Sequence, residues 1–171
     1  MASLEQVHEW IAGGESEILE FKKSTSTKRE AVQTLAAMLN TRGGRVLFGI
    51  DPSGQVVGQE IGDRTIENLS NEIREIEPPI FPSIDRVDIG DGRAVLAVSV
   101  TQGPSKPYVV RSKPYKRIGN TTVEMTRDEH NRMLMEQLHG ERRWENQVAE
   151  DWAIDDLDIS EITRTLDEAV R

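Results

Sequence analysis

The chain has 171 residues, of which 36% are hydrophobic and 30% are charged, a balance typical of one water-soluble globular domain with its own core. It contains no cysteine, which excludes disulfide bonds and thiolate metal sites, and its first residues lack the basic and apolar regions of a signal peptide. The longest aliphatic run, residues 94–98, is too short to cross a bilayer, so we expect a cytoplasmic protein without membrane contacts.

The net charge of −9 is distributed unevenly along the sequence. Residues 21–50 and 101–127 each carry +5, whereas residues 1–20, 51–100 and 141–171 carry −5, −6 and −6. Charges act on one another over a Debye length of roughly 8–10 Å at ordinary salt. Two basic segments that the fold brings together would therefore form a local positive surface on an acidic protein. The alternative is that these cations are scattered over a solvated surface.

Capping boxes at Ser3–Gln6 and Thr27–Glu30 predict two helices in the first part of the chain, the second of which ends near Asn40. The sequence between these helices predicts a strand that presents Glu20 and Lys22 on one face. After the second helix, a near-continuous apolar run predicts a central strand, and a Pro-containing turn would return the chain as a hairpin. The strands predicted here cover residues 17–23, 45–50 and 55–59.

The middle of the chain continues with a helix, a hairpin and a second pair of strands. Asp63 is positioned to cap a helix that Pro78-Pro79 would stop. Two alternating apolar runs around an Asp-Gly turn predict a β-hairpin, and the turn Gly119-Asn120 joins two further short strands. A third capping box, Thr126–Glu129, opens a helix that is predicted to end near Leu138.

The order of these elements predicts an α/β (α+β) fold, with a single mixed-sheet domain flanked by helices and a C-terminal helical extension. We expect residues 1–140 to form the domain, and residues 141–171 to form an acidic linker and a helix that leads to a further domain outside this chain. That helix is predicted from apolar residues at helical spacing, which need a surface to pack on, namely Ile159, Ile162, Leu166 and Val170. The predicted core consists of Leu19, Phe21, Leu35, Leu39, Val46, Phe48, Ile50, Leu96 and Val98.

The stretch Thr41–Gly54 has the glycines of a phosphate loop but not its chemistry. A Walker loop needs Gly-Lys-Ser/Thr after a strand, and this chain has no such tripeptide. The element order is also reversed, because here a helix precedes the glycines and a strand follows them. We therefore predict no nucleotide cofactor, and interpret Gly43-Gly44 as a helix C-cap and turn that need positive φ.

Three motifs occur in order along the chain: Glu20-Phe21-Lys22, then Asn40-Thr41-Arg42-Gly43-Gly44 with Gly49-Ile50-Asp51, and finally Tyr115-Lys116-Arg117-Ile118-Gly119. Together they resemble the Schlafen AlbA-type DNA-binding domain family, formerly called divergent AAA, over about residues 10–138. The resemblance implies an α/β domain at the N-terminus of bacterial transcriptional regulators and helicase-related proteins. A winged-helix or ATPase-like region usually follows the domain in those proteins.

The first functional interpretation is nucleic-acid binding, of DNA rather than RNA, by a transcriptional regulator. Lysine and arginine neutralise phosphates and release counterions, which supplies most non-specific affinity. The candidate cations that belong to the matched motifs are expected near one surface, namely Lys22, Arg42, Lys116 and Arg117. Tyr108 and Tyr115 are candidates to stack on unpaired bases, or else pack as half-buried strand residues. The predicted phosphate contacts are Lys22, Lys23, Arg42, Arg45, Lys106, Arg111, Lys113, Lys116 and Arg117.

A second interpretation is metal-dependent RNA cleavage, because eukaryotic Schlafen relatives use three carboxylates. The resemblance places Glu15 and Glu20 at two of these positions, where they would bind Mg²⁺ or Mn²⁺. The third position falls at Pro52, and strand alternation would aim the adjacent Asp51 at the opposite face. The ordinary alternative is that both glutamates are surface residues, with Glu20 paired to Lys22. The sequence therefore leaves open whether the chain is an enzyme.

A third interpretation is a protein-interaction module that forms a homodimer. Strand edges or the acidic C-terminal segment would supply the contact. The acidic segment, residues 141–171, is also a candidate to compete with nucleic acid for the basic surface.

Overall fold

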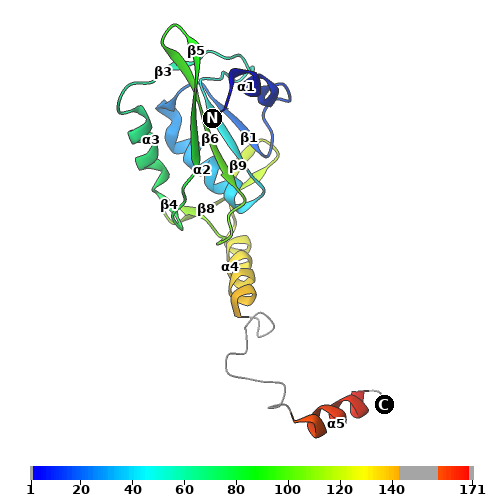
Figure 1. The fold of residues 1–171 in the computed structure, drawn as a ribbon. Helices are drawn as coiled ribbons and strands as arrows, with labels where there is room; N and C mark the ends of the chain where they lie inside the picture. Colours follow the sequence, from blue (N-terminus) through cyan, green and yellow to red (C-terminus); the bar gives the residue numbers. More distant parts are fainter. Residues whose placement is uncertain (1, 143–157, 170–171) are drawn as a thin grey trace. The chain divides into compact units, whose positions relative to one another are not determined.

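The computed structural model describes residues 2–142 and 158–169 of the chain (Figure 1). The chain divides into two compact units, Met1–Gln137 and Leu138–Arg171. Within the described ranges, no helix is both long and apolar enough to cross a bilayer. The predicted assignment of residues 1–140 to a nucleic-acid-binding domain and of residues 141–171 to a linker and helix remains a prediction.

The first sheet of the larger unit is mixed and has five strands. Strand β1 runs parallel to β2, whereas β2, β3 and β5 each pair antiparallel with β6. The predicted hairpin around the Asp-Gly turn is confirmed as β5 and β6. The strands are β1 (Leu19–Lys22), β2 (Gly43–Phe48), β3 (Gln59–Glu60), β5 (Ser83–Gly90) and β6 (Arg93–Thr101).

Both faces of this sheet are covered, which explains the continuous apolar character of β2. Figure 1 shows helices α1 (Leu4–Ile11) and α2 (Lys28–Asn40) on its two sides. Val46 and Phe48 belong to the core cluster on the α2 side, and Leu47 belongs to the cluster on the α1 side. All nine predicted core residues are buried, which confirms that prediction.

A second sheet accounts for the remaining strands, so that the predicted strands are divided between two sheets instead of one. It is antiparallel, in the order β4 (Ile76–Glu77), β7 (Val109–Val110), β8 (Lys113–Ile118) and β9 (Thr121–Glu124). Helix α2 packs against strands of both sheets. Because it lies between them, most residues of α2 from Ala31 to Asn40 are buried, and the mixed α/β fold class is confirmed.

Three local predictions differ from the structure. Thr27 makes no side-chain cap, because a 3₁₀ turn at Thr25–Thr27 precedes α2 and is capped by Ser24 instead. Asp63 does not cap α3 (Thr65–Ile73). At the start of this helix, the Gly62 N–H donates a hydrogen bond to the Thr65 hydroxyl. The second arm of the hairpin expected after residue 54 is reduced to one bridge, between Ile50 and Val56. Strand β3 pairs with β6 instead.

The predicted capping boxes at Ser3 and at Thr126 are confirmed. Ser3 accepts a hydrogen bond from the Gln6 N–H, and the Gln6 side chain accepts one from Ser3. Thr126 and Glu129 exchange the same pair of bonds at the start of α4 (Arg127–Arg142), which extends beyond the predicted end. In the second unit, α5 (Ile159–Ala169) forms the predicted amphipathic helix, and most of the predicted acidic linker lies outside the described residues.

Candidate functional site

The end of α2 is fixed to the second sheet by Asn40, whose side chain is 4% exposed. Its amide nitrogen donates to the carbonyl oxygens of Tyr108 and Tyr115, at 2.8 and 2.9 Å, and its oxygen accepts from the Tyr108 N–H at 2.7 Å. A buried amide that satisfies three backbone groups fixes the position of the chain that follows it. That chain is Thr41–Arg45, the junction from α2 to β2.

Gly43 and Gly44 begin β2 instead of capping α2, since Thr41 is the C-cap residue. Their φ angles of +79° and +151° confirm the predicted need for positive φ. A Cβ at Gly43 would lie 2.7 Å from the Val100 carbonyl oxygen, and one at Gly44 would lie 2.6 Å from that of Ile18. The glycine pair therefore allows three strand backbones to approach closely at this end of the sheet.

Arg117 does not lie at the surface, where it was expected to contact phosphate. Its side chain is 0% exposed and donates to Glu20 at 2.9 Å, to the Thr122 hydroxyl at 2.9 Å and to the Ser16 carbonyl at 2.6 Å. Glu20 also accepts from Lys22 at 2.6 Å, and the Lys22 side chain is only 17% exposed. The first and third sequence motifs thus meet in a largely enclosed ion-pair network that joins β1 to β8.

Three further candidate cations are paired with carboxylates at the surface. Arg111 donates to Glu72 at 2.9 Å and to Glu75 at 3.1 Å, and the bond to Glu75 is the main cause that raises the pKa of Arg111. A bond at 2.8 Å to Glu124 likewise raises the pKa of Lys113. Lys116 pairs with Glu129, whose pKa falls to about 2 mainly because of that bond. These pairs compensate positive charge locally.

The two basic segments meet after α2, where Lys106 of the second segment contacts the backbone next to Arg42 of the first. The ammonium group of Lys106 donates to the Thr41 carbonyl oxygen at 3.2 Å, next to Arg42 in the chain. The Arg45 guanidinium lies 3.9 Å from the centre of the Trp10 ring. Burial lowers the pKa of both Arg45 and Lys106. Lys23, the remaining candidate, is exposed, and its charge contributes to the lowered pKa of Asp51.

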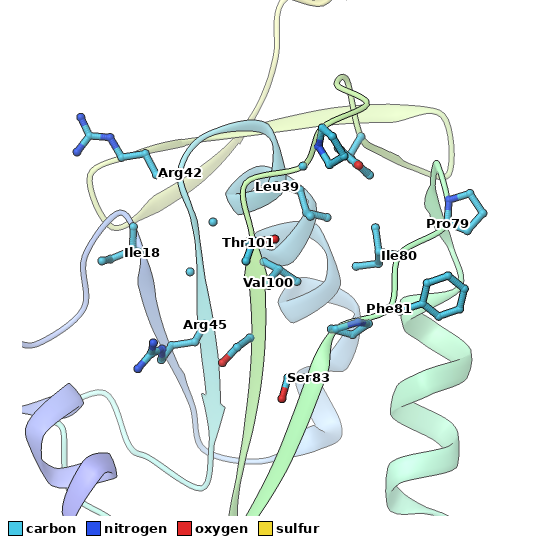
Figure 2. Close-up of a pocket in the computed structure, with 17 residues that line it drawn as sticks. Ile18, Leu39, Arg42, Arg45, Pro79, Ile80, Phe81, Ser83, Val100 and Thr101 are labelled. Atoms are coloured by element: carbon cyan, nitrogen blue, oxygen red, sulfur yellow. The ribbon is translucent and has the colours of Figure 1, made fainter. Parts of the chain in front are cut away.

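A surface cleft of about 750 Å³ is lined by Arg42 and Arg45, but not by Lys106. Figure 2 shows Arg42 and Arg45 on one side of the cleft and Ile80 and Phe81 on the other. Hydroxyl groups of Ser99 and Thr101 lie along the strand between the two sides. Among the described residues that line the cleft, none is aspartate or glutamate.

The three carboxylates considered for a metal site are each engaged elsewhere. Glu15 accepts from the Phe21 N–H at 2.8 Å, and Glu20 is neutralised by the cations of Lys22 and Arg117. Asp51 accepts from the Ser53 hydroxyl at 2.6 Å and from two backbone N–H groups of its own turn, and these bonds lower its pKa. No group of three potential ligands in the described ranges is placed to hold a metal ion. The set does not fit a divalent cation.

The aromatic residues differ most from the sequence-based interpretation. Tyr108 and Tyr115 are 4% and 9% exposed, so their rings are core components and offer no stacking surface. Phe81, which is not among the sequence-predicted site residues, is 97% exposed. The available signal was its position between prolines in Pro78-Pro79-Ile80-Phe81-Pro82, where an aromatic residue has little local structure to pack on.

A family model identifies the family of this chain, and two solved structures share its fold. Residues 15–126 match the model of the family described as Schlafen, AlbA_2. The DIP2311 protein from Corynebacterium diphtheriae is 21% identical with a TM-score of 0.55, and the match covers 78% of this chain but only 28% of that protein. The N-terminal domain of a protein from Nitrosomonas europaea, named as an ATP-dependent DNA helicase RecG-related protein, is 21% identical with a TM-score of 0.52. That match covers 76% of this chain and 97% of the domain. A comparison with curated proteins gives no match.

Proposed function

Because this chain belongs to the Schlafen AlbA_2 family, we propose that it binds nucleic acid, and that Arg42, Arg45 and Lys106 make the phosphate contacts. The observation that carries the proposal is the meeting of the two basic segments where Lys106 contacts Thr41. The likeness to a domain from a protein named as DNA helicase-related supports DNA as the polynucleotide. We also propose that the chain is part of a bacterial transcriptional regulator, which would act in the cytoplasm.

Each of the three side chains is suited to a phosphate in a different way. Arg42 is 77% exposed, and its nearest carboxylate, Glu17, is 3.9 Å away. An exposed ion pair of this kind contributes little free energy, so a phosphate can replace the carboxylate. Arg45 stacks on Trp10, which orients its guanidinium. Lys106 donates to the Thr41 carbonyl oxygen and also interacts electrostatically with Glu136, so a phosphate there would replace a carboxylate interaction.

The binding test is fluorescence anisotropy with labelled DNA at several salt concentrations. Three phosphate contacts predict a log–log slope of about −2 to −3 for the affinity against salt, at about −0.7 to −0.9 per contact. Arg42→Ala and Lys106→Ala should each weaken binding and reduce the slope by about 1. Arg86→Ala is the matched control, because Arg86 pairs with Asp88 on β5 and does not line the cleft.

Two results would contradict the proposal. One is the absence of DNA binding at about 50 mM salt, where phosphate contacts are strong. The other is an equal loss of affinity in Arg86→Ala and Arg42→Ala, since that would reflect total charge and not a site. An RNA of the same sequence that binds more than about tenfold more tightly would overturn the choice of DNA.

Self-association is a second candidate function, favoured by exposed apolar residues on α4. Leu134 is 37% exposed and Met135 is 53% exposed in the described structure. Leu134 and Met135 are adjacent, and contiguous exposed apolar side chains, methionine among them, mark contact surfaces. Analytical ultracentrifugation over a range of concentrations tests it, and a monomer at all concentrations would exclude a homodimer.

A further inference from the structure

We propose that the cleft between Arg42 and Phe81 binds unpaired nucleotides, so that the domain prefers single-stranded DNA to duplex DNA; this rests on the proposed nucleic-acid function. In a duplex, the faces of the bases are covered by their neighbours in the stack. An aromatic side chain gains a stacking partner only where a base is unstacked. Phe81 presents such a ring across the cleft from Arg42 and Arg45.

The exposure of Phe81 follows from how its segment is anchored. Ile80 packs against the core cluster on the α2 side, whereas the next side chain, Phe81, is exposed to solvent. Pro79 and Pro82 flank this pair and restrict the backbone. The ring is thus held in the solvent by a stiff segment at 97% exposure, and little conformational freedom would be lost when a base stacks on it.

The strand register sets the width of the cleft. Arg45 on β2 is opposite Ser99 on β6, and Ser99 is opposite Ser83 on β5. Two strand spacings of about 4.8 Å separate the backbones of Arg45 and Ser83, roughly 10 Å in all. Phe81 lies two residues before Ser83. The backbones at the base of the two sides are therefore separated by a distance on the scale of a single nucleotide.

The chemistry of the cleft favours a nucleotide over an apolar peptide. One side carries guanidinium groups, the strand between carries the hydroxyls of Ser99 and Thr101, and the other side carries Phe81 and Ile80. Phosphate, sugar and base require these three environments in that order. In a chain of net charge −9, a lining of described residues without any carboxylate is complementary to an anionic ligand.

The test compares the affinity of the full chain for an oligothymidine of about 12 nucleotides with its affinity for a hairpin duplex of similar charge, by fluorescence anisotropy. Phe81→Ala should weaken binding to the single strand roughly 5- to 100-fold and change duplex binding less than about twofold. Phe81→Trp should keep or increase the affinity for the single strand. Ile118→Ala is the matched control, because Ile118 is 58% exposed and does not line the cleft.

The outcomes separate this proposal from the proposed function. If Arg42→Ala weakens DNA binding and Phe81→Ala does not, stacking is overturned while nucleic-acid binding stands. If the wild-type chain binds neither oligomer at low salt, both proposals fail. If Phe81→Ala leaves DNA binding intact but abolishes self-association, the occupant of the cleft is a second copy of the chain and the nucleotide proposal is overturned.

Discussion

Glu20 and Arg117 are separated by 97 positions in the sequence, yet they form a buried ion pair. Removing charges from water is costly, and here the cost is offset by the contacts of Arg117 with Glu20, Ser16 and Thr122. The Nε atom of Arg117 has no hydrogen-bond partner among the described residues. Two residues that look like surface charges in the sequence motifs therefore hold strands of the two sheets together.

The Lys116–Glu129 pair predicts a measurable titration. Glu129 has a pKa of about 2 instead of its ordinary 4.5, mainly because Lys116 donates to it. A depressed pKa contributes stability that is fully present above pH 4.5 and is lost as the pH falls through about 2. Carboxyl NMR titration should give this low midpoint, and Lys116→Met should move it toward 4.5. An unchanged midpoint in the variant would contradict the assignment of the shift to Lys116.

At the scale of elements, the start of β2 depends on the absence of side chains. Strand β2 pairs with β1 and β6 on its two sides, and Gly43 and Gly44 lie where both neighbours approach. The same positions place Arg42 and Arg45 at the rim of the cleft. The glycine pair thus serves the geometry of the sheet and the position of the candidate site together.

Gly44→Ala should destabilise the domain by more than about 1 kcal/mol. The new Cβ would lie 2.6 Å from the Ile18 carbonyl oxygen, on a backbone with φ of +151°. Gly13→Ala is the control, because a Cβ there meets nothing within 4 Å, and it should change stability by less than about 0.5 kcal/mol. Urea denaturation followed by circular dichroism measures both, and equal stabilities would show that β1 and β2 adapt without strain.

An element could be predicted where the residues that specify it lie close together in the sequence. The caps at Ser3 and Thr126 and the hairpin of β5 and β6 are encoded within a few residues and were predicted correctly. The pairing of β3 with β6 and the division into two sheets depend on distant partners, which periodicity does not reveal.

The candidate site was predictable only in part, for the same reason. Arg42, Arg45 and Lys106 were among the candidate cations, but sequence spacing could not distinguish them from Arg111, whose partner Glu72 is 39 positions away. The ring of Phe81 was missed because exposure depends on the packing of the neighbouring Ile80.

At the scale of the whole molecule, most of the net negative charge lies outside the part of the sequence that forms the core. The buried hydrophobic residues of the described structure run from Val7 to Met125. Residues 141–171 contribute −6 of the net charge of −9. Acidic and basic segments nearly balance within residues 1–140, which carry a net charge of −3, so most of the net negative charge lies outside the folded core.

Deleting residues 141–171 should leave the unfolding midpoint of the domain unchanged and raise its DNA affinity at low salt, by up to about tenfold. The gain should disappear near 1 M salt, where the Debye length is about 3 Å. Thermal denaturation and anisotropy titrations measure the two effects. Equal DNA affinities of the full and shortened chains at low salt would rule out competition by the acidic segment.

The position of α2 between the sheets has a consequence for how the domain opens. Its apolar residues from Ala31 to Leu39 are buried against strands of both sheets, so separating either sheet would expose the helix to water. Neither sheet can then act as an independent foldon. Amide protons of β2 and β8 would exchange with deuterium through one shared opening event, at a rate set by the stability of the entire domain.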